Sequence, residues 1–268
     1  MSVVPLPSRR PPSPAVVAPP RVVPAGRRSK AGLLAALRRK IEAMERPTGQ
    51  VGAPALGFGL VEIDDALPEG GLRPAALHEI GGVAGPALAF AALIAGRRLG
   101  QTAAGPVLWC TARAGLYPPG LTAFGLVPER LLLVCAGARR RTLWAMEETL
   151  ASGRAALVVG EAGRLGLTES RRLQLAAENG GTPALLLGGE GQGASAAVTR
   201  WRVQSAPSGP AAGYRGVGRI RFRLELTRCR GGRPGAWLVE WDDATHTFTV
   251  AAVLGDGPAL PEAEAVGA

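Results

Sequence analysis

Four long apolar runs, each separated from the next by a stretch long enough for a helix, constrain the fold of this chain most. Apolar residues in continuous runs suit strands whose two sides are both covered, which is the environment of a parallel sheet between layers of helices. A shorter apolar strand precedes them. The five predicted strands are residues 76–80, 107–112, 130–136, 156–162 and 183–189, and we expect the run at 130–136 to be buried like the others.

Three segments between these runs have helical character. Residues 88–99 are apolar and alanine-rich, and residues 141–152 predict a helix with Trp144 and Leu150 facing inward. A third helix covers residues 169–180, with Thr168 as its N-cap, because a threonine hydroxyl can accept a hydrogen bond from a free backbone N–H of the first turn. The order of strands and helices predicts an α/β domain.

The pattern changes after residue 198, where apolar and polar residues alternate. Alternation with a period of two predicts strands with one covered and one solvated face, and the glycine-rich residues 231–235 predict a hairpin turn. The expected strands are residues 199–206, 218–230, 236–242 and 247–253. We therefore expect a mainly parallel sheet flanked by helices and extended by C-terminal antiparallel strands.

The two ends of the chain differ from this core in composition. Dense proline and arginine at the start predict a disordered arm, because proline removes backbone donors and fixes φ. The expected divisions are a disordered Pro/Arg-rich arm at 1–28, an amphipathic helix at 29–46, a linker at 47–55, a core domain at 56–254 and a flexible acidic tail at 255–268.

The segment 29–46 predicts a helix with one apolar stripe, which Ser29 would cap. The stripe consists of Leu33, Leu34, Leu37, Ile41 and Met44. A tethered helix with an apolar stripe must dock on something. At this point the docking site can be the core of the same chain or another protein. We expect the stripe to bind a partner protein.

The formal net charge of +10 favours a polyanion or an acidic protein surface as a partner. No window has the roughly 18 uninterrupted apolar residues of a membrane span, and the proline-spaced N-terminus does not resemble a secretory leader. We therefore expect a cytoplasmic protein without membrane contact. Cys110, Cys135 and Cys229 lack metal-type spacing, and the first two fall in strands predicted to be buried.

The stretch HEIGGVAGPALAF at residues 78–90 has the layout of a phosphate-binding loop. Gly81, Gly82 and Gly85 supply the bend between strand and helix. A working loop needs a lysine for the terminal phosphates and a Ser or Thr for magnesium, whereas Pro86, Ala87 and Leu88 follow here, and no lysine occurs after residue 40. We expect no nucleotide hydrolysis and no cofactor.

Other candidate chemical groups near this bend are few. Glu161 is the only carboxylate in the run at 156–162, and we favour a salt-bridging surface residue over a remnant of a magnesium site. His78 and His246 are the only histidines, and neither has further ligands at useful spacing, so we expect no metal site and no catalytic triad.

Arginines alternate with apolar residues in two of the predicted antiparallel strands. We expect these arginines to share a sheet face opposite Ile220, Phe222 and Leu224. Two interpretations remain open, a solvated sheet face or a ridge that contacts phosphate or an acidic partner. The candidate residues are Arg200, Arg202, Arg219, Arg221 and Arg223. Arg139, Arg140 and Arg141 also open a predicted helix, where positive charge opposes the helix dipole. A contact with a partner or with phosphate explains this run better than helix stabilisation does, and an ordinary loop face is the alternative.

The segment GLVEIDDALPEGGLRPAALHEIGG at residues 59–82 resembles the stretch that leads into the phosphate loop of the RecA family. The resemblance continues through the later strands and covers roughly residues 55–255. With RRLQLAAE followed by PALLL and without the phosphate lysine, the chain most resembles the ImuA family, which is RecA-like and related to SulA.

The resemblance implies a RecA-like fold and a non-catalytic role in inducible error-prone DNA repair. It implies as partners an ImuB-type Y-family-like protein, a DnaE-type error-prone polymerase, RecA and, as a further candidate, DNA. Residues 188–197, where RecA carries a DNA-binding loop, contain no basic residue, which argues against RecA-like DNA binding at that place. Two alternatives remain: a RecA-like ATPase with an unconventional nucleotide site, and a SulA-like inhibitor of cell division.

Overall fold

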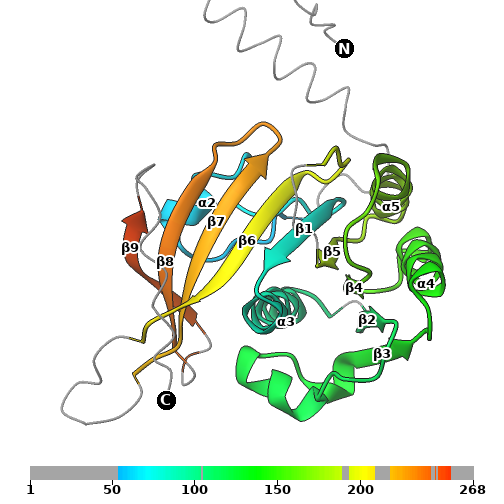
Figure 1. Cartoon of the computed structure of the whole chain (residues 1–268), viewed down its shortest axis with the longest axis horizontal. Helices are drawn as coiled ribbons and strands as arrows, with labels where there is room; N and C mark the ends of the chain where they lie inside the picture. Colours follow the sequence, from blue (N-terminus) through cyan, green and yellow to red (C-terminus); the bar gives the residue numbers. More distant parts are fainter. Residues whose placement is uncertain are drawn as a thin grey trace, which may run out of the picture. The chain divides into compact units, whose positions relative to one another are not determined.

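A nine-stranded sheet forms the centre of the protein (Figure 1). The structure, a computed structural model, describes residues 54–103, 105–188, 193–208, 218–242, 245 and 247–254. The predicted arm, the amphipathic helix at 29–46, the acidic tail and nearly all of the linker therefore lie outside the described residues.

The strand order in the sheet is β3-β2-β4-β5-β1-β6-β7-β8-β9. The six strands from β3 to β6 pair in parallel, and β6 to β9 pair antiparallel. The predicted fold class is confirmed. The strands are β1 (Leu77–Gly82), β2 (Val107–Thr111), β3 (Leu131–Cys135), β4 (Leu157–Glu161), β5 (Ala184–Leu187), β6 (Thr199–Ala206), β7 (Arg221–Cys229), β8 (Gly235–Asp242) and β9 (Thr247–Leu254).

Helices cover the two faces of this sheet unequally. One face packs against α3, and the other packs against α4 and α5, which also pack against each other (Figure 1). None of the described helices combines the length and apolar character needed to cross a membrane. The helices are α2 (Val61–Asp64), α3 (Ala84–Gln101), α4 (Arg139–Ser152) and α5 (Leu167–Gly180), with 3₁₀ turns η1 (Pro118–Phe124) and η2 (Pro128–Arg130).

The residue pattern explains why the two halves of the sheet differ. All five residues of β2 and all four of β5 are buried, as expected for strands covered on both faces. In β6, β7 and β8 buried residues alternate with more exposed ones, because only the side toward α3 joins the core. Trp201, Phe222 and Trp237 belong to that buried side.

The prediction of a buried strand at residues 130–136 was wrong. β3 lies at the edge of the sheet, where it pairs with β2 alone, and the Leu132 side chain is 54% exposed. Cys135, expected to be buried, is exposed, whereas Cys110 is buried as predicted. An apolar run indicates a strand but not its position in the sheet, and only a central position supplies neighbours on both sides.

Two predictions about α4 and α5 also require correction. Trp144 does not face inward but is 62% exposed, while Leu150 is fully buried as predicted. Thr168 does not cap α5, because the helix begins at Leu167 with Gly166 as its N-cap, and Glu169 accepts the Gly166 N–H at 3.1 Å. A carboxylate three residues into the helix thus replaces the threonine hydroxyl as the capping acceptor.

Candidate functional site

The bend at residues 81–85 joins β1 to α3 with a single intervening residue. β1 continues through Gly82, and α3 begins at Ala84. The Val83 N–H between them donates to the Val203 carbonyl of β6 at 3.1 Å. A phosphate loop instead leaves several residues between strand and helix so that their N–H groups can surround an anion. This junction is too short to form such a cradle.

The three glycines of this junction lie in different structural environments. Gly82 has a φ of +109°, and a Cβ added there would lie 2.0 Å from the Val203 carbonyl oxygen, so the close approach of β6 requires a glycine. Gly81 lies within β1 opposite Arg202, and Gly85 has open space around it in the first turn of α3. Pro86, the third residue of the helix, has no N–H to offer a phosphate.

The acidic residues near the junction are engaged by the protein itself. Glu161, at the end of β4, accepts hydrogen bonds from Trp109 Nε1 at 2.6 Å and Thr111 Oγ1 at 3.3 Å. The interpretation of Glu161 as a salt-bridging residue was wrong, because its partners are neutral donors from the neighbouring strand β2. Glu79 is buried in β1, where it accepts from Arg200 Nε at 2.7 Å and from the Ser195 hydroxyl.

His78 is completely buried on β1 and serves as a neutral hydrogen-bonding group. Its Nε2–H donates to the Arg73 carbonyl at 2.9 Å, which leaves Nδ1 to accept the Thr199 hydroxyl at 2.8 Å. Burial lowers the pKa of His78 from 6.5 to about 4. The described residues contain no group of three potential metal ligands, and His246 lies outside them.

The predicted arginines lie on one side of the antiparallel half of the sheet. Phe222 and Leu224 are buried on the opposite side, as expected, but β7 begins at Arg221, so Ile220 and Arg219 precede the strand and Ile220 is exposed. The structure thus brings the five arginines together across β6, β7 and the residues before β7. Whether they bind a ligand stays a prediction.

Carboxylates of the same face alternate with these arginines. Arg202 and Arg223 both approach Glu225, with N–O distances of 3.6 and 2.7 Å. Arg221 pairs with Glu240 at 2.9 Å, and Arg219 pairs with Asp242 at 3.0 Å. Together with the buried pair of Arg200 and Glu79, each of the five arginines has an acidic partner within the chain. The face is a ladder of ion pairs with little uncompensated charge.

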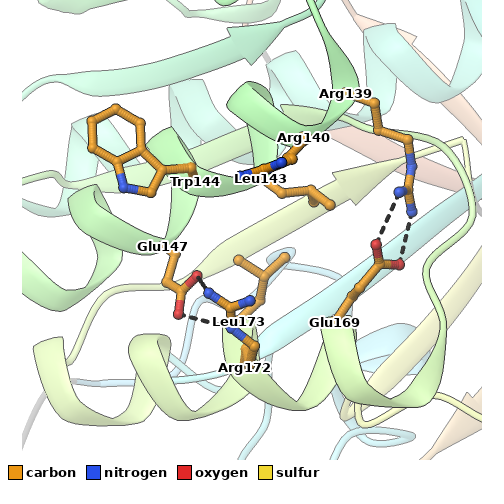
Figure 2. Close-up of a pocket in the computed structure, with 8 residues that line it drawn as sticks. All are labelled: Arg139, Arg140, Leu143, Trp144, Glu147, Glu169, Arg172 and Leu173. Atoms are coloured by element: carbon orange, nitrogen blue, oxygen red, sulfur yellow. Dashed lines mark hydrogen bonds and ion pairs between the residues drawn. The ribbon is translucent and has the colours of Figure 1, made fainter.

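A groove of about 470 Å³ lies between α4 and α5 (Figure 2). Leu143 and Leu173 lie between the two helices, and the Trp144 side chain projects from α4 at one end. Ion pairs cross the groove on its rim. The Arg139 guanidinium contacts both Glu169 oxygens at 2.9 and 2.8 Å.

The second rim pair joins Arg172 Nε to Glu147 Oε1 at 3.2 Å (Figure 2). The Arg139 guanidinium, with the Gly166 N–H, holds the pKa of Glu169 below its usual range. Arg140, which also lines the groove, and its neighbour Arg141 are exposed and carry no ion pair within the described part of the chain.

Sequence reasoning pointed to Arg139, Arg140 and Arg141 as a contact for a partner or phosphate but did not find the groove beside them. The run of three arginines at 139–141 was the available clue, since it opens α4 against the helix dipole without an acidic residue in the first turn. The exposure of Trp144 could not be predicted, because a tryptophan at helical spacing from Leu150 fits an inward position equally well.

Comparison with known proteins finds curated relatives and a solved structure. Two curated relatives are both named Protein ImuA and come from two different strains of Caulobacter vibrioides. Each is 39% identical to this chain over 211 residues. The match covers 72% of this chain and 86% of each relative. SulA from Pseudomonas aeruginosa, a solved structure, is 28% identical with a TM-score of 0.38, over 44% of this chain and all of that one. No family model matches the chain.

Proposed function

The chain belongs to the ImuA family, and from that premise we propose that it is a non-catalytic adaptor in SOS-induced translesion DNA synthesis. In this role it links an ImuB-type Y-family-like protein, and through it a DnaE-type error-prone polymerase, to RecA or to damaged DNA. Such an assembly acts on chromosomal DNA, so the proposed location is the cytoplasm. The observation that carries the proposal is the 39% identity to Protein ImuA over 86% of that protein.

The non-catalytic part of the proposal rests on the junction between β1 and α3. One residue separates strand from helix, its N–H is bonded to Val203, and Pro86 removes a further donor. The sequence contains no lysine after residue 40 that could replace the missing phosphate lysine. An ATPase would need both an anion cradle and a positive group for the terminal phosphates.

The adaptor part favours protein partners over bare DNA. A phosphate backbone binds uncompensated Lys or Arg, and binding weakens steeply with salt. The arginine face of β6 and β7 has acidic partners for each of its five arginines, which lowers its attraction for phosphate. The predicted helix at 29–46, with Leu37 and Ile41 in its apolar stripe, supplies a protein-binding element in this proposal.

Binding to RecA-coated single-stranded DNA, measured beside bare DNA at about 150 mM salt, tests the proposal, because non-specific phosphate binding is already weakened there. We expect the chain to prefer the coated strand. Leu37→Asp with Ile41→Asp should abolish this preference and leave the melting of the core unchanged.

Three results would contradict the proposal in different ways. Equal binding to coated and bare DNA would make the chain a DNA-binding protein. Magnesium-dependent ATP binding would support the ATPase alternative. Binding to the tubulin-like division protein, with none to RecA or an ImuB-type protein, would support the SulA-like inhibitor.

A further inference from the structure

The groove between α4 and α5 combines an apolar floor with unsatisfied positive charge. Leu143 and Leu173 form the floor, and Trp144 stands at its end with 62% of its surface exposed. An exposed tryptophan next to such a floor is typical of protein-binding sites, where large aromatic side chains act as anchors.

The beginning of α4 supplies the charge. Arg139, Arg140 and Arg141 occupy the first turn, the N-cap is Ala138, and no side chain caps the helix. Positive residues at a helix N-terminus are unfavourable, and an anion there relieves both the charge and the free N–H groups. Arg139 is already paired with Glu169, so Arg140 and Arg141 remain to bind an incoming anion.

The rim favours a carboxylate-bearing protein segment over nucleic acid. Glu147 and Glu169 are each paired with an arginine at the rim, so among the described groove residues Arg140 is the one arginine without such a pair, which is little for the closely spaced phosphates of a DNA backbone. A phosphate group has no apolar surface to bury against the floor. A segment with a few spaced carboxylates and an aliphatic side chain can satisfy Arg140 and fill the floor together.

Residues 255–268 of this chain have that composition. The segment contains Asp256, Glu262 and Glu264, no basic residue, and the aliphatic residues Leu260 and Val266, in a chain whose formal net charge is +10. Among the terminal segments outside the described residues, the other one, residues 1–53, is basic. Charge complementarity therefore selects 255–268 as the occupant.

The sheet topology indicates that the segment comes from a second copy. β9 ends at Leu254, six strand spacings from β4, against which α4 packs, which is roughly 29 Å at about 4.8 Å each. Leu260 follows six residues later and reaches only about 20 Å in an extended chain. The antiparallel half of the sheet also packs around α3, on the face away from the groove (Figure 1).

We propose that the α4–α5 groove is a docking site for residues 255–268 of a second copy of this chain. Leu260 enters between Leu143, Trp144 and Leu173, and Glu262 and Glu264 pair with Arg140 and Arg141. Reciprocal exchange of the two segments gives a closed two-fold dimer. This inference does not depend on the proposed function.

Sedimentation velocity of the full chain over about 1 to 100 µM tests it, a range in which micromolar affinities are resolved. We expect a monomer–dimer equilibrium that weakens between about 50 and 500 mM salt, since exposed charges are screened. Trp144→Ala should weaken the dimer at least about tenfold, as loss of an anchor residue does. Tyr117→Ala, which removes an aromatic side chain that is 70% exposed outside the groove, should leave it unchanged.

A charge exchange separates docking in the groove from general attraction. Arg140→Glu with Arg141→Glu, and Glu262→Arg with Glu264→Arg, should each weaken the dimer, and the combination of all four changes should restore it. Arg113→Glu is the control, because Arg113 is also exposed and lies outside the groove.

Several outcomes would overturn the inference. A chain that stays monomeric throughout has no such dimer, and a dimer insensitive to Trp144→Ala uses another surface. Loss of binding to labelled single-stranded DNA in Arg140→Glu, with the dimer unaffected, would assign the groove to phosphate instead.

Discussion

The two faces of the sheet differ in how completely their helices close the core. The face under α3 carries a continuous aromatic cluster. The ring centroids of Phe90 and Trp201 lie 5.7 Å apart, and Trp201 also packs on Phe58 and Trp237. The face under α4 and α5 has a smaller core without aromatic residues, and leaves Trp144 in solvent. The closed face supplies stability, and the open face is where we place a docking site.

The position of α3 explains the difference. α3 packs against β1, β4, β5 and β6, and the antiparallel strands add aromatic side chains around it, so its residues are buried on most sides. α4 buries only a stripe that includes Thr142, Met146 and Leu150. Two helices side by side on one face of a sheet leave their outer surfaces free, and this surface can bind without disturbing the core.

The largest contrast is expected between two tryptophans on opposite faces. Trp201→Ala should lower the free energy of unfolding by about 3–5 kcal/mol, because the side chain is 1% exposed and packs on three aromatic rings. Trp144→Ala should change it by less than about 0.5 kcal/mol. Urea denaturation of both variants measures the difference, and similar losses would show that the two faces are equally closed.

A buried ion pair should matter more than an exposed one. Glu79→Gln should lower the free energy of unfolding by about 3 kcal/mol. The change removes the carboxylate partner of Arg200, whose side chain is only 16% exposed. Glu147→Gln removes the partner of Arg172, whose side chain is 64% exposed, and should cost less than about 1 kcal/mol. Denaturant midpoints compare them, and an equal effect would indicate that water reaches Glu79.

Acid should weaken the α3 face before it weakens the groove. His78 has a pKa of about 4 when folded and 6.5 as its ordinary value, so the unfolded chain takes up the proton first as pH falls. The free energy of unfolding is therefore highest above pH 6.5. It should fall by about 1.4 kcal/mol for each unit that the pH is lowered between about pH 6 and 4.5.

The groove should respond only at lower pH, because the pKa of Glu169 lies below its usual range and its contribution is lost as pH falls further. His78→Gln should flatten the slope between about pH 6 and 4.5, and His246→Asn serves as the control. A slope unchanged by His78→Gln would assign the effect to other groups.

The smallest changes in stability are expected on substituting two glycines where β1 meets α3. Gly82→Ala should destabilise by about 2 kcal/mol, because its φ of +109° and the Val203 carbonyl both oppose a Cβ. Gly85→Ala should stabilise by about 0.5–1 kcal/mol, since the position is helical and open. Thermal melting gives both signs, and a stabilising Gly82→Ala would show that the junction is not held against β6.

Residue patterns were sufficient for the order and type of the nine strands and of α3, α4 and α5, but not for α2 or the two 3₁₀ turns. The apolar runs predicted the parallel strands, and alternation around Trp201, Phe222 and Leu224 predicted the antiparallel ones with the correct buried side. These patterns are local, because the period of a strand or helix is set by its own backbone geometry. The glycine bend without a phosphate lysine was also visible in the sequence.

Position and pairing required the tertiary structure. The sequence could not place β3 at an edge, turn Trp144 outward, or give Glu161 the Trp109 indole as its partner, since each depends on neighbours that are distant along the chain. Nor could it show that five arginines on one face meet carboxylates from β1, β7 and β8. The sequence by itself determined which elements form and that the phosphate lysine is absent. Only the tertiary structure decided which charges are compensated and which apolar side chains stay exposed, because burial and pairing depend on long-range contacts.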